Sequence, residues 1–186
     1  MDVKQAIENR RAFRSLDPVE ITDVLIDDLA TSAHLFCSCF NNQPWRYVFV
    51  HDPAMLKQLH NALSKGNEWA CDASMIIAVF SKKEFDCLIK NREYFLFDTG
   101  MATAALILRA TELGLVAHPI AGFDEKKAKE TLNIPPDMTL ITLVMVGKHS
   151  ESVKAVLSDK QKEAEQARPE RMPFSKSIFI NSYKEQ

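Results

Sequence analysis

Hydrophobic positions recur along the chain at two spacings, and they predict helices alternating with short strands. Helical spacing marks five segments, namely Asp2 to Arg10, Thr22 to Cys37, Asp52 to Leu63, Tyr94 to Leu113 and Asp124 to Leu132. Compact apolar or β-branched runs mark four strands, at Arg46 to His51, Ser74 to Ser81, Val116 to Ile120 and Leu140 to Val146. This mixture indicates an α/β or α+β domain in three layers.

Two of these segments also suggest their surroundings. The run from Met75 to Phe80 is apolar without alternation, which is typical of a central strand covered on both faces. The helix at 94–113 is rich in small residues, which allow another helix or a partner subunit to approach closely, and Gly114 ends it.

The C-terminal region reads differently from the rest of the chain. Lys148 to Arg171 is charged, with few core positions, and is too long for a tight connection, so we expect an arm. Ile178 to Ile180 has strand character, and an isolated strand needs a partner elsewhere. We therefore treat residues 1–186 as one domain, with 148–186 as a C-terminal arm and strand.

Composition narrows the class of protein. The chain is 46% hydrophobic and 26% charged, and its formal net charge of -2 lacks the basic footprint of a nucleic-acid binder. The most apolar stretch, Phe95 to Leu115, is interrupted by Asp98, Arg109 and Glu112, so we expect no membrane span. We see no targeting signal, and we expect a cytoplasmic location.

The cysteines are expected to be free thiols in a reducing compartment. They are Cys37, Cys39, Cys71 and Cys87. A C-x-C pair occurs in some metal sites, but no histidine spacing completes a ligand set here, so we predict no metal site.

Arg10, Arg11 and Arg14 place three guanidinium groups within five residues at the end of the first predicted helix. Arginine presents a fork of donors that matches phosphate oxygens, and close guanidinium groups overcome their repulsion when they share an anion. The cluster suggests a phosphate site. The alternative is that these side chains complement a helix C-terminus and are merely solvated.

A loop dense in amide side chains, Ser38 to Arg46, precedes the strand at 46–51. Asn41, Asn42 and Gln43 each offer donors and acceptors, as the edge of a planar heterocycle with C=O and N–H groups requires. The alternative is an Asx turn leading into the strand, with Trp45 in the core.

A third candidate is the loop His118 to Phe123, at the end of a predicted strand and before a helix. Ala121 and Gly122 allow backbone N–H groups to approach a ligand, and strand ends often hold cofactors in α/β proteins. His118 is more simply a loop or core histidine than an acid or base.

These three segments, in this order, resemble the nitroreductase family of FMN-dependent oxidoreductases. The chain from Cys37 to Trp45 is similar to the family pattern Pro-Ser-x-x-Asn-x-Gln-Pro-Trp, with Cys37 in place of proline. The chain from Pro119 to Phe123 matches the family loop Pro-Ile-x-Gly-Phe. The arginine stretch stands where relatives grip the FMN phosphate, with Ala12 where serine is usual.

The resemblance implies a set of cofactor-binding residues. They are Arg10, Arg11, Ala12, Arg14, Ser38, Cys39, Asn41, Gln43, Pro119, Ile120, Ala121, Gly122 and Arg171. Asn41 would bond the flavin ring, Ser38 and Cys39 would approach from a second subunit, and backbone at Ala121 would face flavin N5. Arg171, with Arg168 as second match, would contact the phosphate.

The resemblance also implies a fold and a reaction. The fold would be α+β, a three-layer α/β/α arrangement with a mixed, mainly antiparallel sheet and the C-terminal segment exchanged in a homodimer. FMN, bound at the interface, would take hydride from NADH or NADPH and reduce a nitroaromatic or quinone in a ping-pong cycle, with no catalytic acid or base. Alternatives are a specialised FMN enzyme of this family, a non-catalytic flavin-binding or sensing protein, and a plain anion-binding domain.

Overall fold

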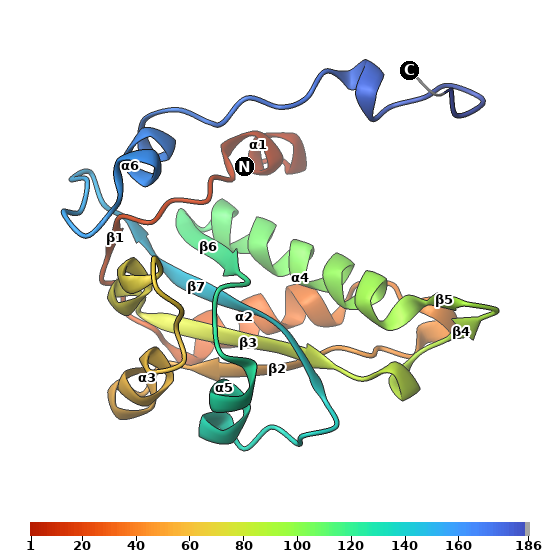
Figure 1. The fold of residues 1–186 in the computed structure, drawn as a ribbon, viewed down its shortest axis with the longest axis horizontal. Coiled ribbons are helices and arrows are strands. Elements are labelled where there is room, and N and C mark those ends of the chain that lie inside the picture. The colour runs from red at the N-terminus through yellow and green to blue at the C-terminus, as the bar shows by residue number, and fades with distance from the viewer. Residues whose placement is uncertain (185–186) are drawn as a thin grey trace.

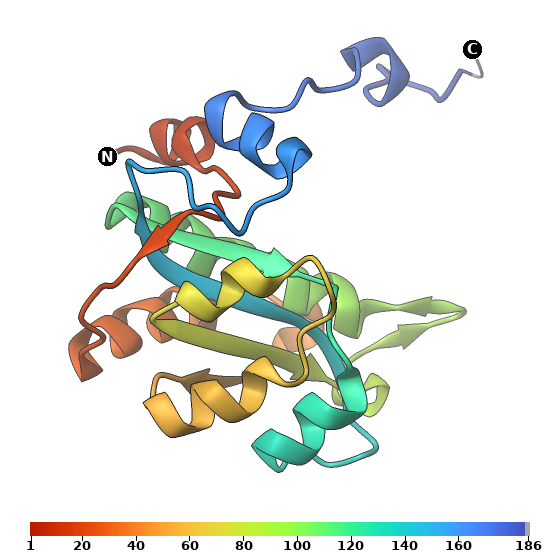
Figure 2. The same cartoon turned by 60° about the vertical axis from the view of Figure 1, so that its left-hand side comes forward.

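Helices surround a central sheet in the structure, a computed structural model that describes residues 1–184 (Figures 1 and 2). The helices are α1 (Val3–Asn9), α2 (Asp23–His34), α3 (Pro53–His60), α4 (Tyr94–Glu112), α5 (Glu125–Leu132) and α6 (Asp159–Gln166). The strands are β1 (Leu16–Asp17), β2 (Arg46–Val50), β3 (Met75–Ser81), β4 (Leu88–Ile89), β5 (Arg92–Glu93), β6 (Leu115–Ile120) and β7 (Thr139–His149). Short 3-10 turns occur at η1 (Cys39–Asn41), η2 (Glu68–Asp72), η3 (Lys83–Phe85) and η4 (Phe174–Lys176). Every helix and strand predicted between Asp2 and Val146 is present, with ends shifted by a few residues.

The main sheet is built around β3 and β7, which lie side by side. β3 pairs with β2 on one edge and with β7 on the other, while β6 pairs with β7 and β1 pairs with the end of β7. All pairings described between residues 1 and 184 are antiparallel. Each residue of β3 is buried, so the prediction of a central strand at 74–81 is confirmed.

The two faces of the sheet pack against different helices. Ile77 and Val79 of β3 lie in one core cluster with residues of α2 and α4. Ile76 and Ala78, which point the opposite way because side chains alternate along a strand, lie in a second cluster with residues of α3, η2 and α5. Helices on both faces of one sheet make the predicted three-layer α+β fold, which is confirmed.

Helix α4 covers one face of the sheet along its length. Ala102, Leu106 and Ala110 are fully buried against the sheet and α2, as the small-residue pattern suggests. Gly114 has φ +76, a conformation that suits glycine, and the helix ends just before it. Even this 19-residue helix is not apolar enough to cross a membrane, and the other helices of residues 1–184 are not either.

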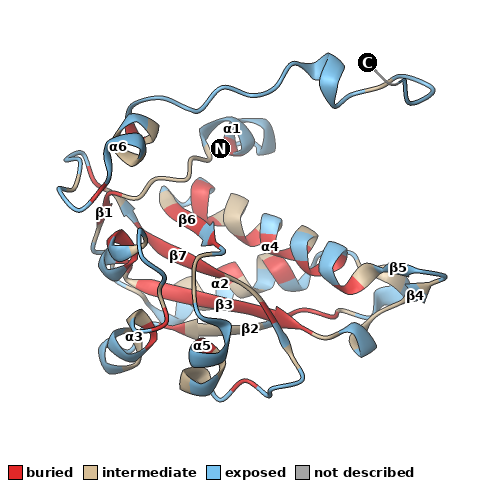
Figure 3. Cartoon of the chain, viewed as in Figure 1, coloured by how far each residue is buried: buried red, intermediate tan, exposed pale blue. Residues whose placement is uncertain are grey.

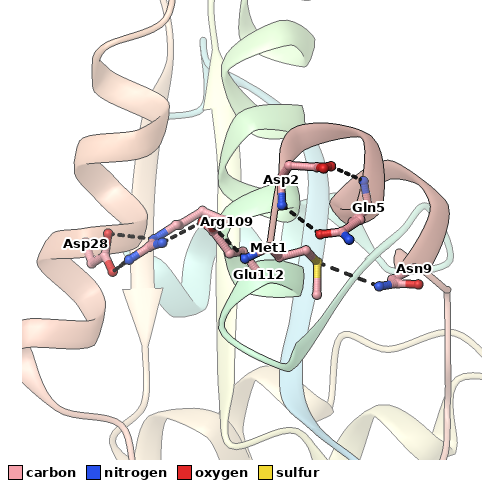
Figure 4. A network of polar contacts seen from close by, with 7 residues as sticks. All are labelled: Met1, Asp2, Gln5, Asn9, Asp28, Arg109 and Glu112. Carbon is pink, nitrogen blue, oxygen red and sulfur yellow. Dashed lines mark hydrogen bonds and ion pairs between the residues drawn. The ribbon is translucent and has the colours of Figure 1, made fainter.

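Polar contacts at the C-terminal end of α4 join it to α1 and α2 (Figure 4). Arg109 donates from Nε and Nη2 to the Asp28 carboxylate at 3.0 and 2.6 Å, and from Nη1 to Glu112 at 2.6 Å. These contacts hold the pKa of Asp28 below and that of Arg109 above the usual value. The amino group of Met1 lies 3.9 Å from Glu112, which brings the start of the chain to the same place.

The C-terminal arm contains a helix that the sequence pattern missed. α6 is almost entirely polar, so it lacks the apolar period that predicts a helix, but a capping box between Ser158 and Gln161 starts it. It lies close to α1, and beyond it the chain extends away from the body (Figures 1 and 3).

The segment from Ile178 to Ile180 pairs with no strand within residues 1–184, so a strand that pairs elsewhere stays a prediction. Ile178 is 60% exposed and Ile180 83% exposed. A strand needs a neighbouring backbone to bond, and among residues 1–184 no strand pairs with this segment.

Candidate functional site

The arginine cluster lines a cavity of about 510 Å³ between the end of α1 and α6. The cationic residues of its wall are Arg10, Arg11, Arg14, Lys160, Arg168 and Arg171. Ala12, at the position where the related family usually has serine, lines the same cavity and offers no hydroxyl. The structure therefore brings the predicted cluster together with both arginines that were matched near the C-terminus.

Like charges crowd this cavity. Burial, and then the nearby guanidinium groups of Arg168 and Arg171, lower the pKa of Arg10. Repulsion of this kind is relieved by an anion, and the volume lies within the range of small-molecule pockets. The structure thus gathers the cluster around one cavity rather than spreading it over the surface of a helix end.

A buried carboxylate holds the cluster in place. Glu165 of α6 accepts the backbone N–H of Arg14 at 2.7 Å and that of Ser15 at 3.2 Å. Arg11 donates to the carbonyl of Ala164 at 2.7 Å, and Arg168 donates to the carbonyl of Arg10 at 2.8 Å. The sequence analysis missed Glu165, because nothing in a charged run marks which acid is buried.

Phe13 and His149 support the arginine stretch from the other side. Their rings stack with centroids 3.6 Å apart, and the guanidinium of Arg11 lies 4.6 Å from the Phe13 ring centroid. The aromatic pair thus orients a side chain that carries one of the cavity's charges.

His118 connects the cavity to strand β6. Its Nδ1 lies 3.0 Å from the carbonyl oxygen of Phe13. Its ring stacks on that of Trp69, with centroids 4.8 Å apart, and the guanidinium of Arg14 lies 5.8 Å from the centroid of the Trp69 ring. Burial lowers the pKa of His118 to about 4, and the nearby positive charges act in the same direction. His118 is a buried neutral histidine, as the simpler interpretation expected.

The predicted loop at 119–122 begins within the last two residues of β6 and continues beyond the strand. Pro119 and Ala121 are exposed, while Ile120 is buried and its carbonyl accepts from the Thr142 hydroxyl at 2.8 Å. Ala121 is therefore an exposed residue at the end of β6.

Gly122 is fixed by a segment that the sequence analysis did not single out. Its carbonyl accepts the N–H of Ser64 at 3.0 Å and the side-chain amide of Asn67 at 2.9 Å. A Cβ at position 122 would lie 2.3 Å from Asn67 Nδ2, so only glycine fits without movement. Asn67 thus supports the loop of the candidate site, and nothing around it in the sequence marks this contact.

The amide-rich loop forms a tight turn at the other end of the molecule. Phe40, Asn41 and Gln43 have φ values of 48, 57 and 51, which are unusual for residues other than glycine. The Ser38 hydroxyl accepts the N–H of Gln43 at 2.9 Å, and the Gln43 side chain donates to the carbonyl of Asn41 at 3.0 Å. Backbone strain of this kind is concentrated at functional sites.

Cys39 and Cys87 are joined by a disulfide, so the expectation of four free thiols is wrong for this pair. The two residues are 48 positions apart, and only the fold brings η1 against the segment before β4. Cys37 and Cys71 are free and exposed, as expected. Cys39, Asp86 and Cys87 also form a compact group of metal-ligand atoms, all within 4.8 Å of one another.

Within a single chain, the amide-rich loop and the cationic cavity lie far from each other. The amide-rich loop is held at Asp98 of α4, which accepts the N–H of Cys39 at 2.6 Å. The N-terminus, just before α1, is held at Glu112 of the same helix. Fourteen helical residues span roughly 20 Å, so the loop at 38–43 does not complete the cationic cavity of its own chain.

Several known proteins resemble this chain in sequence. The nitroreductase family model matches residues 54–148. The chain is 24% identical to YdgI of Bacillus subtilis, provisionally named an NAD(P)H nitroreductase, covering 81% of this chain and 90% of that one. It is 25% identical to a Thermus thermophilus protein named NADH dehydrogenase, covering 81% of this chain and 88% of that one.

Solved structures give the same result. A crystal structure described as an oxidoreductase containing FMN superposes with a TM-score of 0.84 at 26% identity, covering 100% of this chain and 95% of the other. A nitroreductase family protein from Clostridium novyi superposes at 0.75 over 81% of this chain and 87% of the other, with 23% identity. The family match over half of the sequence, together with these folds, shows that the chain belongs to the nitroreductase family and is an oxidoreductase.

Proposed function

We propose that the protein binds FMN, takes hydride from NADH or NADPH, and reduces a small organic acceptor of the nitroaromatic or quinone type in a ping-pong cycle. The observation that carries this proposal is the cationic cavity between the end of α1 and α6, whose arginine stretch meets β6 where the Phe13 carbonyl contacts His118. A relative of known structure contains FMN, and other relatives are named for NADH or NAD(P)H.

The residues present fit the phosphate of FMN. The cavity gathers guanidinium groups from the start and the end of the chain, Arg10, Arg14 and Arg171 among them, around a space of about 510 Å³. Bidentate donors of this kind match phosphate oxygens, and the absence of a hydroxyl at Ala12 removes one hydrogen bond that relatives make. We assign the phosphate to this cavity.

The residues at the end of β6 fit the reactive part of the cofactor. When bound, the flavin supplies the hydride chemistry, so the protein has to position and stabilise it. Ala121 presents its backbone there, and Gly122 is locked by Ser64 and Asn67. A backbone N–H is a preorganised donor, which stabilises negative charge without a titrating side chain.

The amide-rich loop belongs to the proposal through a second copy of the chain. Asn41 and Gln43 lie roughly 20 Å along α4 from the end where α1 is attached. In a homodimer the loop of one subunit, with Ser38 and Cys39, would face the cavity of the other. We therefore propose two composite sites per dimer, formed by single-domain chains, and a cytoplasmic location, where NADH and NADPH are available.

The test follows the visible absorbance of the protein after incubation with FMN and removal of excess FMN. Retained absorbance that bleaches anaerobically with NADH or NADPH, and returns with a quinone or nitroaromatic, is the expected result. A protein that retains no FMN would refute the proposal. Retained FMN that neither donor reduces would leave a flavin-binding protein and refute the proposed reaction.

A pair of variants tests the assignment of the phosphate. Arg10→Gln removes a charge from the cavity wall, and we expect a weaker FMN affinity by about 1–2 kcal/mol, which is roughly tenfold. Lys4→Gln removes a charge from the same helix, from an exposed residue outside the cavity. Equal FMN affinities of the two variants, measured by fluorescence titration, would contradict the assignment.

A further inference from the structure

A second centre of reactive groups lies at the amide-rich loop, away from the cationic cavity. The disulfide between Cys39 and Cys87 ties η1 to the segment that leads into the β4–β5 hairpin, and the Cα atoms are 6.3 Å apart. Both cysteines are partly exposed, so a small reductant can approach them. Nothing in the proposed reaction uses this pair.

The cross-link holds a strained turn. Phe40 and Asn41, directly after Cys39, have φ values of 48 and 57. Such backbone persists only where its surroundings determine it. Besides the disulfide, the contacts that bridge to this turn are the N–H of Cys39 to Asp98 and the Asn42 side chain to Asp86 and Cys87. The disulfide is the covalent member of this group.

Two carboxyl groups anchor the cross-linked residues. Asp98 is 2% exposed and accepts the N–H of Cys39 at 2.6 Å. Asp86 precedes Cys87 and accepts its N–H at 2.8 Å. The backbone on both sides of the disulfide is therefore held in place by a carboxylate.

An amide completes the centre. Asn42 Nδ2 lies 3.3 Å from Cys87 Sγ and 3.2 Å from Asp86 Oδ1. A donor at this distance stabilises a thiolate on Cys87. The turn therefore carries two sulfur atoms and a thiolate-stabilising donor in one place.

We propose that Cys39 and Cys87 form a reversible thiol–disulfide site, whose oxidised form holds the 38–43 turn and whose reduced form releases it. The reductant is a dithiol. Its thiolate attacks one sulfur atom, the S–S bond breaks to give a mixed disulfide, and its second thiol displaces the other protein sulfur. Two electrons and two hydrogens pass to the protein as two thiols, and the dithiol leaves as a cyclic disulfide. The departing thiolate takes its proton from solvent.

A change in this turn would also affect flavin binding, and only this part of the inference rests on the proposed function. The turn carries Asn41 and Gln43, which we assign to the flavin of the partner subunit. Release of the turn would lower the affinity for FMN, so the thiol state of this pair would set how much flavin is bound.

The first experiment counts thiols and needs no flavin. Protein equilibrated with oxidised or reduced dithiothreitol is alkylated with N-ethylmaleimide under denaturing conditions, and the number of labels per chain is determined by mass spectrometry. We expect two labels, on Cys37 and Cys71, after oxidation and four labels after reduction. Four labels after oxidation, or a native mass that includes a metal ion on the unlabelled pair, would overturn the proposal.

The second experiment measures release of the turn. Phe40 is 84% exposed, and chymotrypsin cleaves after it. We expect cleavage at this bond to be at least several-fold faster in the reduced parent, and in Cys87→Ser, than in the oxidised parent. Oxidised Cys37→Ser should be cleaved as slowly as the oxidised parent. Equal cleavage of the oxidised and reduced parent protein would overturn the proposal, whatever the folding of the variants.

Discussion

Replacing Glu165 with alanine tests whether one buried carboxylate organises the cationic cavity. Its side chain is 3% exposed, and its two oxygens accept backbone N–H groups of Arg14 and Ser15 at 2.7 and 3.2 Å. His149 Nε2 lies 3.5 Å from the same carboxylate. Alanine would leave both N–H groups without this acceptor, at a place where Ser15 is fully buried.

The expected loss of stability follows from these two hydrogen bonds. A hydrogen bond to a charged group contributes about 1.5–3 kcal/mol, and water entering the space left by the side chain recovers part of that energy. We therefore expect Glu165→Ala to lower the free energy of unfolding by about 3 kcal/mol. For a chain of this size, that corresponds to a fall in Tm of roughly 6–12 °C.

The assay compares thermal unfolding of Glu165→Ala with that of Glu163→Ala at one protein concentration. Glu163 lies on the same helix and is exposed, so its replacement should change Tm by less than about 2 °C. Binding of FMN should weaken in the first variant only, because α6 carries part of the cavity wall. A Tm for Glu165→Ala within about 2 °C of the control would refute the reasoning.

Three further predictions concern separate parts of the fold. Burial lowers the pKa of His118 from 6.5 to about 4, so between these pH values the unfolded chain binds a proton that the folded chain does not. The free energy of unfolding should therefore be constant above pH 6.5 and fall by about 3 kcal/mol as the pH drops to 4. Urea unfolding at pH 7.5 and 4.5 should show this loss in the parent and a smaller one in His118→Gln, and equal losses would contradict it. Gly122→Ala should push away the Asn67 amide and cost about 1 kcal/mol, as should Asn67→Ala, and an unchanged stability of both would count against the contact. Arg109→Met should cost about 1 kcal/mol by losing the fork on Asp28, and the loss should shrink in 1 M salt; a loss that salt does not change would argue against an ionic origin.

Local patterns predicted those parts of the site that lie within one segment. The arginines at 10, 11 and 14 stand out in sequence because three guanidinium groups fall at one helix end, and the structure puts them in one cavity. Gly122 was found because a small residue between a strand and a helix is a local signal, and the structure shows why glycine is needed.

Contacts between distant segments were out of reach. Glu165 lies in a run of charged residues, and its burial depends on where α6 packs, which its polar sequence does not reveal. The Cys39–Cys87 disulfide joins residues 48 positions apart, so their spacing gave no sign of the pair and free thiols were expected. Asn67 acts on Gly122 through a contact 55 positions away. Each of these residues is defined by the chain it meets rather than by its neighbours in sequence.

The division of the candidate site between the two ends of α4 has a physical consequence for assembly. Near the end that holds the amide-rich turn, Phe40, Leu96 and Phe97 are 84%, 45% and 61% exposed. Exposed apolar side chains that lie in one region often mark a surface that binds another protein. A second copy of the chain would cover these side chains, and the turn of each subunit would then face the cationic cavity of the other. Dimer formation would thus bury the apolar surface and complete the site at the same time, so we expect affinity for FMN to rise with the fraction of dimer.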